Sequence, residues 1–268
     1  MKKLIYIVVF LILLAVAGVS VGHIYMPIHE DNVSAHAYED LRRFVEAPVP
    51  ELISGPDASR TDTASSPDAP SSPPAASTDS TPSQVQVDFE SLRAVNPEVV
   101  GWLTIDGTDI DYPIAQHSDN DYYLHHLFNG EWNSSGCIFL DSRDSSDFSD
   151  KNSILYGHHM DNGSMFQNLM YYKDQSFYNE HPTAQLITPD GSCVVEFFAG
   201  YVSTVDGDAW RLDFTSDEEF GDWLKAVKEK SLFESIIVPT AADRIVTLST
   251  CSYEFYNARF VVHGTIRE

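Results

Sequence analysis

Residues 244–251 read RIVTLSTC, and residues 259–266 read RFVVHGTI. Both stretches are rich in β-branched and aromatic residues, which are the side chains that favour a β-strand. A short polar loop, Ser252–Ala258, lies between them. The sequence therefore predicts two successive strands, with Cys251 at the point where the first strand gives way to the loop.

Six further stretches of this kind precede the pair, bounded by Gly, Pro, Asp or Asn: Val99–Ile105, Ile110–Ile114, Cys137–Leu140, Ser153–Tyr156, Ala184–Thr188 and Cys193–Val202. One longer helix is indicated by a capping box and an apolar face, formed by Ser216, Glu219, Phe220, Trp223, Leu224 and Val227. Shorter helices are predicted at Phe89–Val95 and Gln175–Glu180. Many strands with few helices predict a mainly β domain over residues 88–268, either a barrel or a sandwich.

The composition of the chain excludes some classes of protein. It has 268 residues, with 40 Asp and Glu against 16 Lys and Arg, and a formal net charge of -24. A chain this acidic is repelled by phosphate backbones, which argues against a nucleic-acid binder. Its three cysteines cannot form a disulfide-dense scaffold, and their odd number leaves at least one thiol unpaired or paired between chains.

An N-terminal membrane anchor is predicted at residues 1–26. Lys2 and Lys3 precede an uncharged run from Leu4 to Gly22, and a helix needs about 20 apolar residues to cross a bilayer. The two lysines favour a cytoplasmic N-terminus and an exported body. The alternative is a cleaved signal peptide, but the apolar part of such a peptide is usually only about 7–15 residues long. Under both interpretations the rest of the chain is exported.

Two segments separate this anchor from the β domain. Residues 27–53 form a predicted juxtamembrane stem, with apolar residues at helical spacing between Ser34 and Ala47. Residues 54–87 form a predicted linker, of which 54–84 contain nine Ser, six Pro and four Thr but no large apolar residue. A segment with so little to bury is expected to be disordered. We therefore expect a flexible tether that lifts the domain off the membrane.

Three residues with complementary chemistry lie at predicted strand ends. Cys251 ends one strand, His158 follows Ser153–Tyr156, and Arg259 begins the last strand. A cysteine attacks as its thiolate, a neighbouring imidazole can take the thiol proton, and a guanidinium can stabilise an oxyanion. Each residue type also has a common structural role, in the core for Cys and at the surface for His and Arg. Chemistry alone therefore leaves a catalytic and a structural interpretation open.

Longer motifs around these residues resemble the sortases, and class B sortases in particular. Thr247–Cys251 followed by Arg259 is similar to the sortase nucleophile strand and its downstream arginine. Tyr156–His158, followed by Met160 and then by residues 163–166, is similar to the class B histidine loop. Three upstream segments match the opening of the family: Val100–Leu103, Ile110–Pro113 and Asp119–Leu124. The resemblance covers nearly all of residues 88–268 and keeps their order.

The resemblance implies an eight-stranded sortase-type β-barrel with a few peripheral helices, and a catalytic trio of His158, Cys251 and Arg259. It implies that Cys251 attacks a Thr-Gly or Thr-Asn bond in a C-terminal sorting signal of a surface protein. His158 then protonates the departing amine, and a cell-wall amine opens the thioester. Arg259 holds either the oxyanion or the substrate backbone, and both roles stay open.

The implied partners are therefore surface proteins with sorting signals and a peptidoglycan precursor that carries an amine. The implied location is the extracellular face of a cell membrane, to which the N-terminal helix attaches the enzyme. We expect no cofactor, no metal ion and no nucleic acid.

The same motif matching assigns Asn120, Leu124, Tyr156 and Ser249 to the substrate groove. Structural roles are equally open for these residues, including a turn at Asn120. His159 is the alternative to its neighbour as the catalytic histidine. The family pattern favours the residue directly after the glycine, and neighbours on a strand point to opposite sides, so only one of the pair is expected to face Cys251.

Other polar clusters receive structural interpretations. Asp141, Asp144, Asp147 and Asp150 recur every third residue, but their spacing is not that of an EF-hand, so a solvated acidic loop is favoured over a calcium site. The pair His125-His126 has no third ligand at metal-site spacing and is taken as structural. Cys137 and Cys193 are expected to be buried in strands. Cys251 is expected to be free.

Two other functions compete with a transpeptidase. A secreted cysteine peptidase would transfer the acyl group to water. Papain-like enzymes, however, place Cys before His in the chain, whereas here His158 comes before Cys251, and the caspase pentapeptide is missing. A membrane-tethered binding domain with an inert Cys251 is the other alternative.

Overall fold

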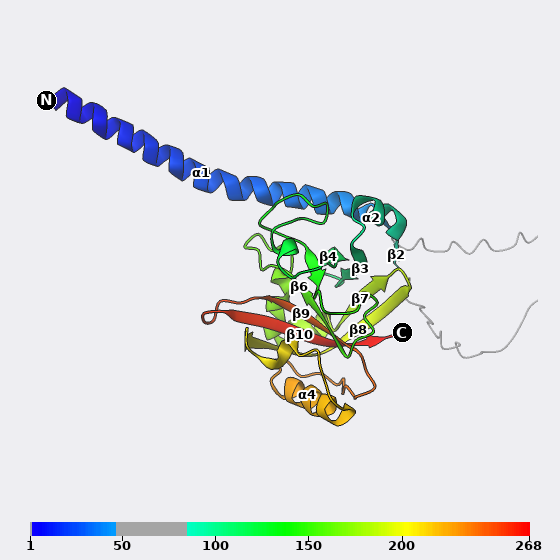
Figure 1. The fold of residues 1–268 in the computed structure, drawn as a ribbon. Coiled ribbons are helices and arrows are strands. Elements are labelled where there is room, and N and C mark those ends of the chain that lie inside the picture. The colour runs from blue at the N-terminus through cyan, green and yellow to red at the C-terminus, as the bar shows by residue number, and fades with distance from the viewer. Residues whose placement is uncertain (1, 47–84) are drawn as a thin grey trace, which may run out of the picture.

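The computed structural model describes residues 2–46 and 85–268, which form a long helix leading into a β-barrel (Figure 1). Eight strands close the barrel in the order β10-β8-β7-β3-β4-β5-β6-β9. Their bounds are β3 (Val99–Thr104), β4 (Asp111–Ala115), β5 (Ile138–Leu140), β6 (Asn152–Tyr156), β7 (Thr183–Thr188), β8 (Gly191–Thr204), β9 (Ile245–Cys251) and β10 (Ala258–Arg267). The predicted eight-stranded barrel with few helices is confirmed, and each predicted strand lies within a residue or two of an observed one.

Helices surround the barrel and occupy the connections between its strands. They are α1 (Lys2–Arg42), α2 (Phe89–Val95), α3 (Gln175–Glu180) and α4 (Asp217–Glu229), with three 3₁₀ turns, η1 (Tyr122–Leu124), η2 (Gln167–Lys173) and η3 (Asp208–Trp210). Side chains cap three of the helices, because Asp88 accepts the backbone N–H of Ser91, Asp174 that of Ser176 and Ser216 that of Glu219. Such caps satisfy N–H groups that have no partner within the helix.

Two of the neighbouring pairs of barrel strands are parallel, and the other six are antiparallel. The parallel pairs are β4 with β5 and β6 with β9. The last two strands along the chain, β9 and β10, form an antiparallel pair in which Arg259 lies opposite Cys251. These two arrangements determine which residues meet at the edge where β6 and β9 end.

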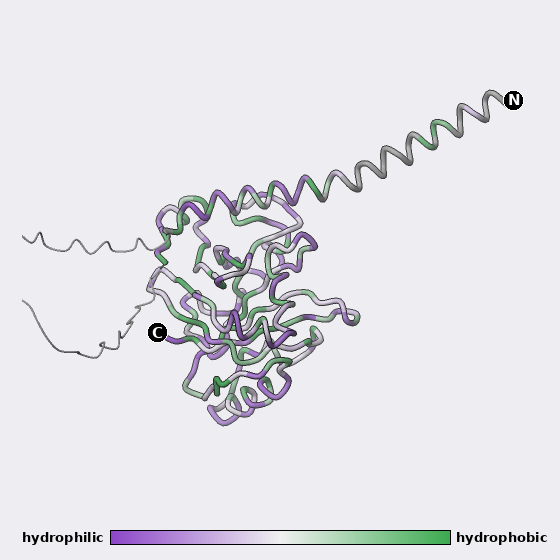
Figure 2. Tube along the Cα trace, turned by 180° about the vertical axis from the view of Figure 1, so that it is seen from behind, coloured by the Kyte–Doolittle hydropathy of each residue, from purple (hydrophilic) through white to green (hydrophobic). Residues whose placement is uncertain are grey.

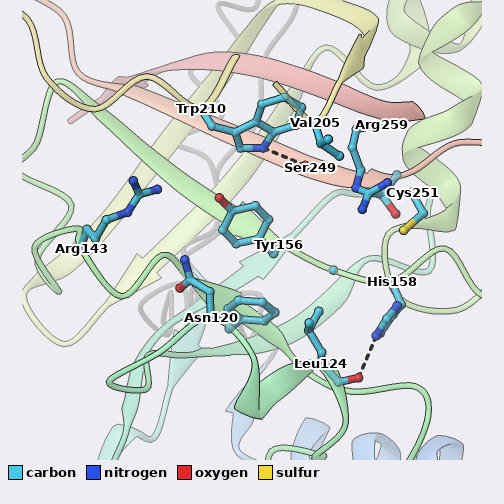
Figure 3. Close-up of a pocket in the computed structure, with 13 residues that line it drawn as sticks. Asn120, Leu124, Arg143, Tyr156, His158, Val205, Trp210, Ser249, Cys251 and Arg259 are labelled. Carbon is cyan, nitrogen blue, oxygen red and sulfur yellow. Dashed lines mark hydrogen bonds between the residues drawn. The ribbon is translucent and has the colours of Figure 1, made fainter. Parts of the chain in front are cut away.

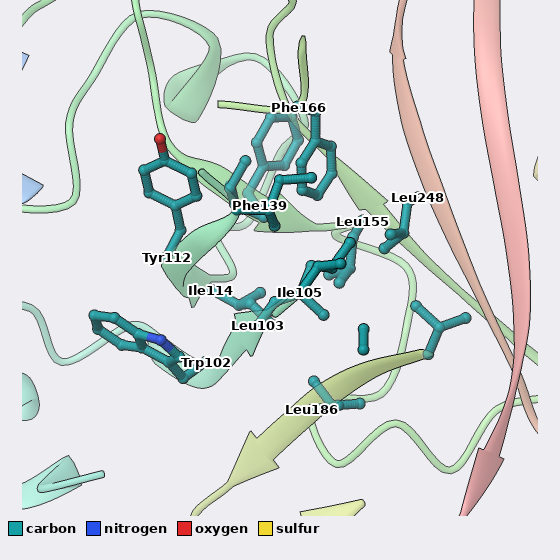
Figure 4. Packing of buried hydrophobic residues seen from close by; sticks show 14 of the residues in the cluster. Trp102, Leu103, Ile105, Tyr112, Ile114, Phe139, Leu155, Phe166, Leu186 and Leu248 are labelled. Atoms are coloured by element: carbon teal, nitrogen blue, oxygen red, sulfur yellow. The ribbon is translucent and has the colours of Figure 1, made fainter. Parts of the chain in front are cut away.

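The barrel interior is filled by apolar side chains from all around the sheet (Figure 4). Leu103, Ile105, Ile114, Leu155 and Leu248 are each fully buried or nearly so. A fully buried side chain of this size contributes about 1.5–3 kcal/mol through the hydrophobic effect. The core thus provides a rigid frame for the loops at the barrel edge.

A second apolar cluster lies between α4 and the outer face of β8 and β10. The predicted apolar face of α4 is buried there, with Trp223 and Phe220 packing near Phe198 and Val261. Hydropathy colours change around this helix and along the strands, as expected of elements with one buried face (Figure 2). The helix predicted from its apolar spacing is confirmed.

Helix α1 runs along the barrel and makes specific contacts with it. Tyr38 and Leu41 are buried against the core, and the Tyr38 hydroxyl donates to the Gly136 carbonyl at 2.6 Å. Further along, Asn133 donates to the Glu30 carbonyl at 3.0 Å, and Arg42 forms an ion pair with Asp111 at 3.0 Å. The predicted short helix near residues 34–47 is therefore the end of a helix that begins at Lys2.

The membrane span predicted within residues 1–26 is not supported by the described part of the chain. None of the helices in residues 2–46 and 85–268 is both long enough and apolar enough to cross a bilayer.

The two ends of the segment 47–84 are paired with each other. In a two-stranded sheet, β1 (Val45–Glu46) runs antiparallel to β2 (Gln86–Val87), with Val45 opposite Val87. The predicted disorder of residues 54–84 lies outside the described residues. The predicted spacer, residues 54–87, lies almost wholly outside the described residues and stays a prediction; the residues on either side of the segment pair with each other, and the C-terminal part of α1 packs on the barrel.

Candidate active site

The register of β6 and β9 brings His158 and Cys251 to the same edge of the barrel. These strands are parallel, and Tyr156 lies opposite Ser249. The ladder continues one residue further, where the Gly157 N–H donates to the Ser249 carbonyl at 3.1 Å. Because parallel strands end at the same edge, the residues two positions beyond Tyr156 and Ser249 both emerge there.

The position between Tyr156 and His158 requires a glycine. A Cβ atom at Gly157 would lie 2.7 Å from the ring of Phe166, closer than real Cβ contacts. The absence of a side chain lets the chain turn from β6 into the histidine loop over a packed core.

Arg259 reaches the same edge from the opposite neighbour of β9. It is the register partner of Cys251 in the antiparallel pair β9 and β10, and directly opposed residues in such a pair project to the same side. Its guanidinium Nη1 donates to the Ala258 carbonyl at 3.0 Å. The Arg259 side chain is therefore held on the same side as the Cys251 thiol. In the described part of the chain it forms no ion pair with Asp or Glu.

The three residues line one open cavity of about 380 Å³ (Figure 3). Cys251, His158 and Arg259 lie at one end of it, and Asn120 and Arg143 lie at the other. The full lining comprises Asn120, Leu124, Phe139, Arg143, Tyr156, Gly157, His158, Val205, Trp210, Ser249, Thr250, Cys251 and Arg259. All seven residues assigned to the site from the sequence are on this wall.

His158 is held by a backbone carbonyl of the facing loop. Its Nε2 lies 2.8 Å from the Leu124 carbonyl oxygen. A carbonyl can only accept, so Nε2 carries the hydrogen and Nδ1 is the nitrogen left to exchange a proton with a thiol. Burial lowers the pKa of His158 below its ordinary value, and the nearby His125 and Arg259 lower it further, although the bond to Leu124 opposes them.

His159 points elsewhere, and it is not part of the cavity lining. Its Nδ1 lies 3.0 Å from the Cys251 carbonyl oxygen, and its ring packs near Tyr253 with centroids 5.1 Å apart. This histidine therefore supports the backbone of the Cys251 loop, whereas His158 faces the cavity.

The three cysteines have different surroundings. Cys251 is free and half-buried at the cavity wall, so its sulfur is accessible from the cavity. Cys137 is free and fully buried, and burial raises the pKa of its thiol to about 12. The expectation that Cys193 is buried is wrong, because it lies half-exposed near the start of β8, where one sheet face is open to solvent.

The residues matched to the substrate groove are fixed by hydrogen bonds. The Tyr156 hydroxyl donates to Asp141 Oδ2 at 3.0 Å, and Asn120 Oδ1 accepts the Ser142 N–H at 2.8 Å. The Ser249 hydroxyl accepts from the Trp210 indole N–H at 3.2 Å. These bonds join five separate parts of the chain, around residues 120, 141, 156, 210 and 249.

Sequence reasoning missed several residues of this wall, above all Arg143 and Trp210. Trp210 is half-buried in η3, in the connection between β8 and α4. A tryptophan in a connection between predicted elements was an available signal, since such a side chain needs a surface to pack on. No sequence pattern pointed to Arg143, because its position in the cavity wall depends on its hydrogen bonds to the buried Asp141.

The prediction of a solvated acidic loop is only partly right. Asp147 is exposed, but Asp141 and Asp144 are buried. The reason is that both carboxylates have partners: Asp141 binds Arg143, and Asp144 accepts the Ile154 N–H at 2.7 Å. Within the described residues, no group of three or more His, Cys, Asp or Glu side chains could hold a metal ion.

The chain is similar to known proteins over the whole of this cavity. A family model described as "Sortase domain" matches residues 103–267, which include every lining residue. Sortase B of Listeria monocytogenes is 41% identical over 191 residues, which are 70% of this chain and 78% of that protein. Sortase B of Staphylococcus aureus is 37% identical over 184 residues, covering 68% and 75%. The solved structure of a Staphylococcus aureus sortase B-substrate complex has a TM-score of 0.65 at 36% identity, covering 67% of this chain and 84% of that one.

Proposed function

This chain belongs to the sortase family of cysteine transpeptidases, and on that premise we propose that it attaches surface proteins to the cell wall. It cleaves a C-terminal sorting signal at a Thr-Gly or Thr-Asn bond, holds the protein as a thioester on Cys251 and passes it to a cell-wall amine. The observation that carries the proposal is the open cavity that Cys251, His158 and Arg259 line together.

Acylation begins with transfer of the Cys251 proton to Nδ1 of His158. The thiolate attacks the threonine carbonyl carbon, and the peptide C–N bond breaks as the imidazolium returns the proton to the departing amine. Burial of His158 lowers its pKa, which makes the imidazolium a stronger acid toward that amine. The bond from Nε2 to the Leu124 carbonyl keeps the ring oriented through both proton transfers.

Arg259 stabilises the negative oxygen that forms on the attacked carbonyl. Its register with Cys251 supports this role, because the oxyanion forms within bonding distance of the attacking sulfur. Removing one oxyanion donor typically costs about 10²–10³ in kcat. The same guanidinium can also hold the carbonyl of the bound threonine in the ground state.

Deacylation reverses these steps with a different nucleophile. An amine attacks the thioester carbonyl, gives a proton to His158, and the Cys251 thiolate leaves. Two related solved structures support binding of this kind, since one is a Staphylococcus aureus sortase B-substrate complex and another is sortase B complexed with triglycine.

We also propose that the enzyme is attached to the outer face of a cell membrane. Its support is the sequence pattern of Lys2 and Lys3 followed by the uncharged run 4–22. Membrane fractionation of cells that produce the full chain, compared with a variant lacking residues 4–22, tests it. Recovery of the full chain in the soluble fraction would contradict the anchor.

Peptide cleavage by the purified full-length chain tests the activity. Peptides with a central Thr-Gly or Thr-Asn bond are incubated with and without triglycine, and the products are identified by mass spectrometry. We expect a Cys251-linked thioester and, with triglycine, a new amide bond. Cys251→Ala and His158→Ala should abolish both products while the far-ultraviolet circular dichroism spectrum stays unchanged.

The same assay separates the alternatives. Hydrolysis that triglycine never diverts to a new amide bond would favour a peptidase. A binding domain with an inert thiol predicts no cleavage, and alkylation of Cys251 no faster than that of a free cysteine. Either result would contradict transpeptidation.

A further inference from the structure

A buried carboxylate lies directly behind the end of the cavity that is farthest from Cys251. The Asp141 side chain has no exposed surface. Its Oδ1 accepts the Arg143 backbone N–H at 3.0 Å and the Arg143 Nε at 2.9 Å, and its Oδ2 accepts Arg143 Nη2 at 2.7 Å and the Tyr156 hydroxyl at 3.0 Å. Burial opposes ionisation of this group, but the hydrogen bonds from Arg143 outweigh it and hold the pKa of Asp141 below its ordinary value.

The residues that bind this carboxylate are themselves part of the cavity wall. Arg143 and Tyr156 both line the cavity, and Asn120 is held by the N–H of Ser142, the residue next to Asp141. Figure 3 shows Arg143 and Asn120 at the end opposite to Cys251. One buried group therefore fixes most of the polar surface at that end, although it does not line the cavity itself.

Asp141 leaves Arg143 with donor capacity for a ligand. The carboxylate engages Nε and Nη2, and Nη1 takes no part in the pair. The Arg143 side chain is 61% exposed, so a bound peptide can reach it. The Asp141 carboxylate balances the positive charge of the Arg143 guanidinium. The pair is therefore better suited to bind a neutral oxygen acceptor of a ligand than a negatively charged carboxylate of a ligand. The acidic chain, at -24, adds to that preference.

We propose that Asp141 is a positioning residue of the substrate groove, holding Arg143 and Tyr156 as a subsite for a neutral oxygen acceptor on the residue upstream of the cleaved threonine, for which a side-chain amide serves as the probe. The inference rests on the proposed function. It assigns no chemical step to Asp141, whose effect reaches the peptide only through the two residues that it binds.

The test compares two buried carboxylates of the same loop. Asp141→Asn removes the charge that fixes Arg143, whereas Asp144→Asn changes a neighbour whose side chain binds the Ile154 N–H rather than a groove side chain. Both variants and wild type, as full-length chains, are assayed with three peptides that differ only in one upstream residue: an amide, a carboxylate or an alkyl side chain of similar size.

For Asp141→Asn we expect KM for the amide peptide to rise about tenfold, as for loss of about 1.4 kcal/mol from a charge-assisted hydrogen bond. Its kcat should stay within twofold, and its preference for the amide over the alkyl peptide should disappear. Asp144→Asn should lower the melting temperature but keep the wild-type KM and preference. The alkylation rate of Cys251 should be the same in all three proteins.

A second variant keeps the inference testable if Asp141→Asn fails to fold. Arg143→Gln changes an exposed side chain and should show the same loss of preference, with a lower melting temperature because the buried Asp141 carboxylate loses its cation. Equal KM values for wild type, Asp141→Asn and Arg143→Gln would overturn the inference while leaving the proposed function intact. A wild-type chain that cleaves none of the peptides would instead contradict the proposed function, and the inference with it.

Discussion

Cys251 and Arg259 are register partners in the antiparallel pair β9 and β10. Directly opposed residues in such a pair have Cβ atoms about 5 Å apart, so the guanidinium reaches the sulfur from a neighbouring strand rather than from a mobile loop. The hydrogen bonds of the barrel thus fix the spacing between the nucleophile and the positive charge. Catalysis at this site should be sensitive to the shape of the group at 259 as well as to its charge.

Replacement of Arg259 by lysine should therefore lower kcat/KM by about 10²-fold, the usual cost of a lost oxyanion donor. Lysine keeps the charge, but it lacks the planar set of donors that can bond the oxyanion and the Ala258 carbonyl together. Steady-state cleavage of a fluorogenic sorting peptide measures the effect. Arg244→Lys, on the same sheet but paired with Glu268, is the matched control, and activity near wild type in Arg259→Lys would contradict the role.

Acid should destabilise the barrel through the buried His263. Burial lowers the pKa of this histidine to about 3, whereas an unfolded histidine titrates near ~6.5. Below pH 6.5 the unfolded chain therefore binds a proton that the folded chain refuses. The free energy of unfolding should fall by up to about 1.4 kcal/mol per pH unit from this group alone, from pH 6.5 down to about 3.

Urea unfolding of wild type and His263→Gln at pH 7.5, 5.5 and 4.5 isolates this effect. Asp144, whose pKa burial raises to about 7, acts in the opposite direction, but it contributes equally to both proteins. The difference in stability between the two proteins should shrink as the pH falls. A difference that does not depend on pH would contradict the role of His263.

Tyr38→Phe should destabilise the protein by about 1–2 kcal/mol, because the buried Gly136 carbonyl loses its hydrogen bond. In a domain of this size the melting temperature should fall by about 3–6 °C. Tyr25→Phe is the matched control, since Tyr25 lies on the same helix but is 63% exposed. Equal melting temperatures for the two variants would show that the contact between α1 and the barrel adds no stability.

Replacement of residues 47–84 by Asn-Gly should leave the protein folded and active. The pairing of Val45 with Val87 brings the two ends close enough for a tight hairpin turn, which Asn-Gly favours. A shorter loop costs less closure entropy, by about 2 kcal/mol for this change in length. Thermal unfolding and kcat/KM are compared with a Gly/Ser segment of the original length, and a tenfold loss of activity in the Asn-Gly variant alone would contradict the prediction.

Local signals were sufficient for most of the secondary structure. The helices Phe89–Val95 and Gln175–Glu180 have the predicted bounds, because their caps and apolar spacing are properties of neighbouring residues. The strand that ends at Cys251 was equally clear, because a run of β-branched residues favours an extended chain wherever it packs. The motifs that resemble sortases added the barrel topology and the seven groove residues.

Other features could not be predicted, since they depend on residues far apart in the chain. No local pattern showed that Val45 pairs with Val87 across the segment between them. The charge pattern of the acidic loop suggested solvation, but Asp141 is buried because Tyr156 and Arg143 satisfy it.

The sequence by itself determined which residues could form strands and which carried nucleophile, acid and cation, because side-chain chemistry and short-range spacing are written in the chain. The sequence motif favoured His158 over His159, but only the tertiary structure brought His158 and Cys251 to one cavity and placed Asp141 behind the groove. Both outcomes follow from closure of the barrel: the parallel register of β6 and β9 is set by packing among all eight strands, and no local pattern specifies it.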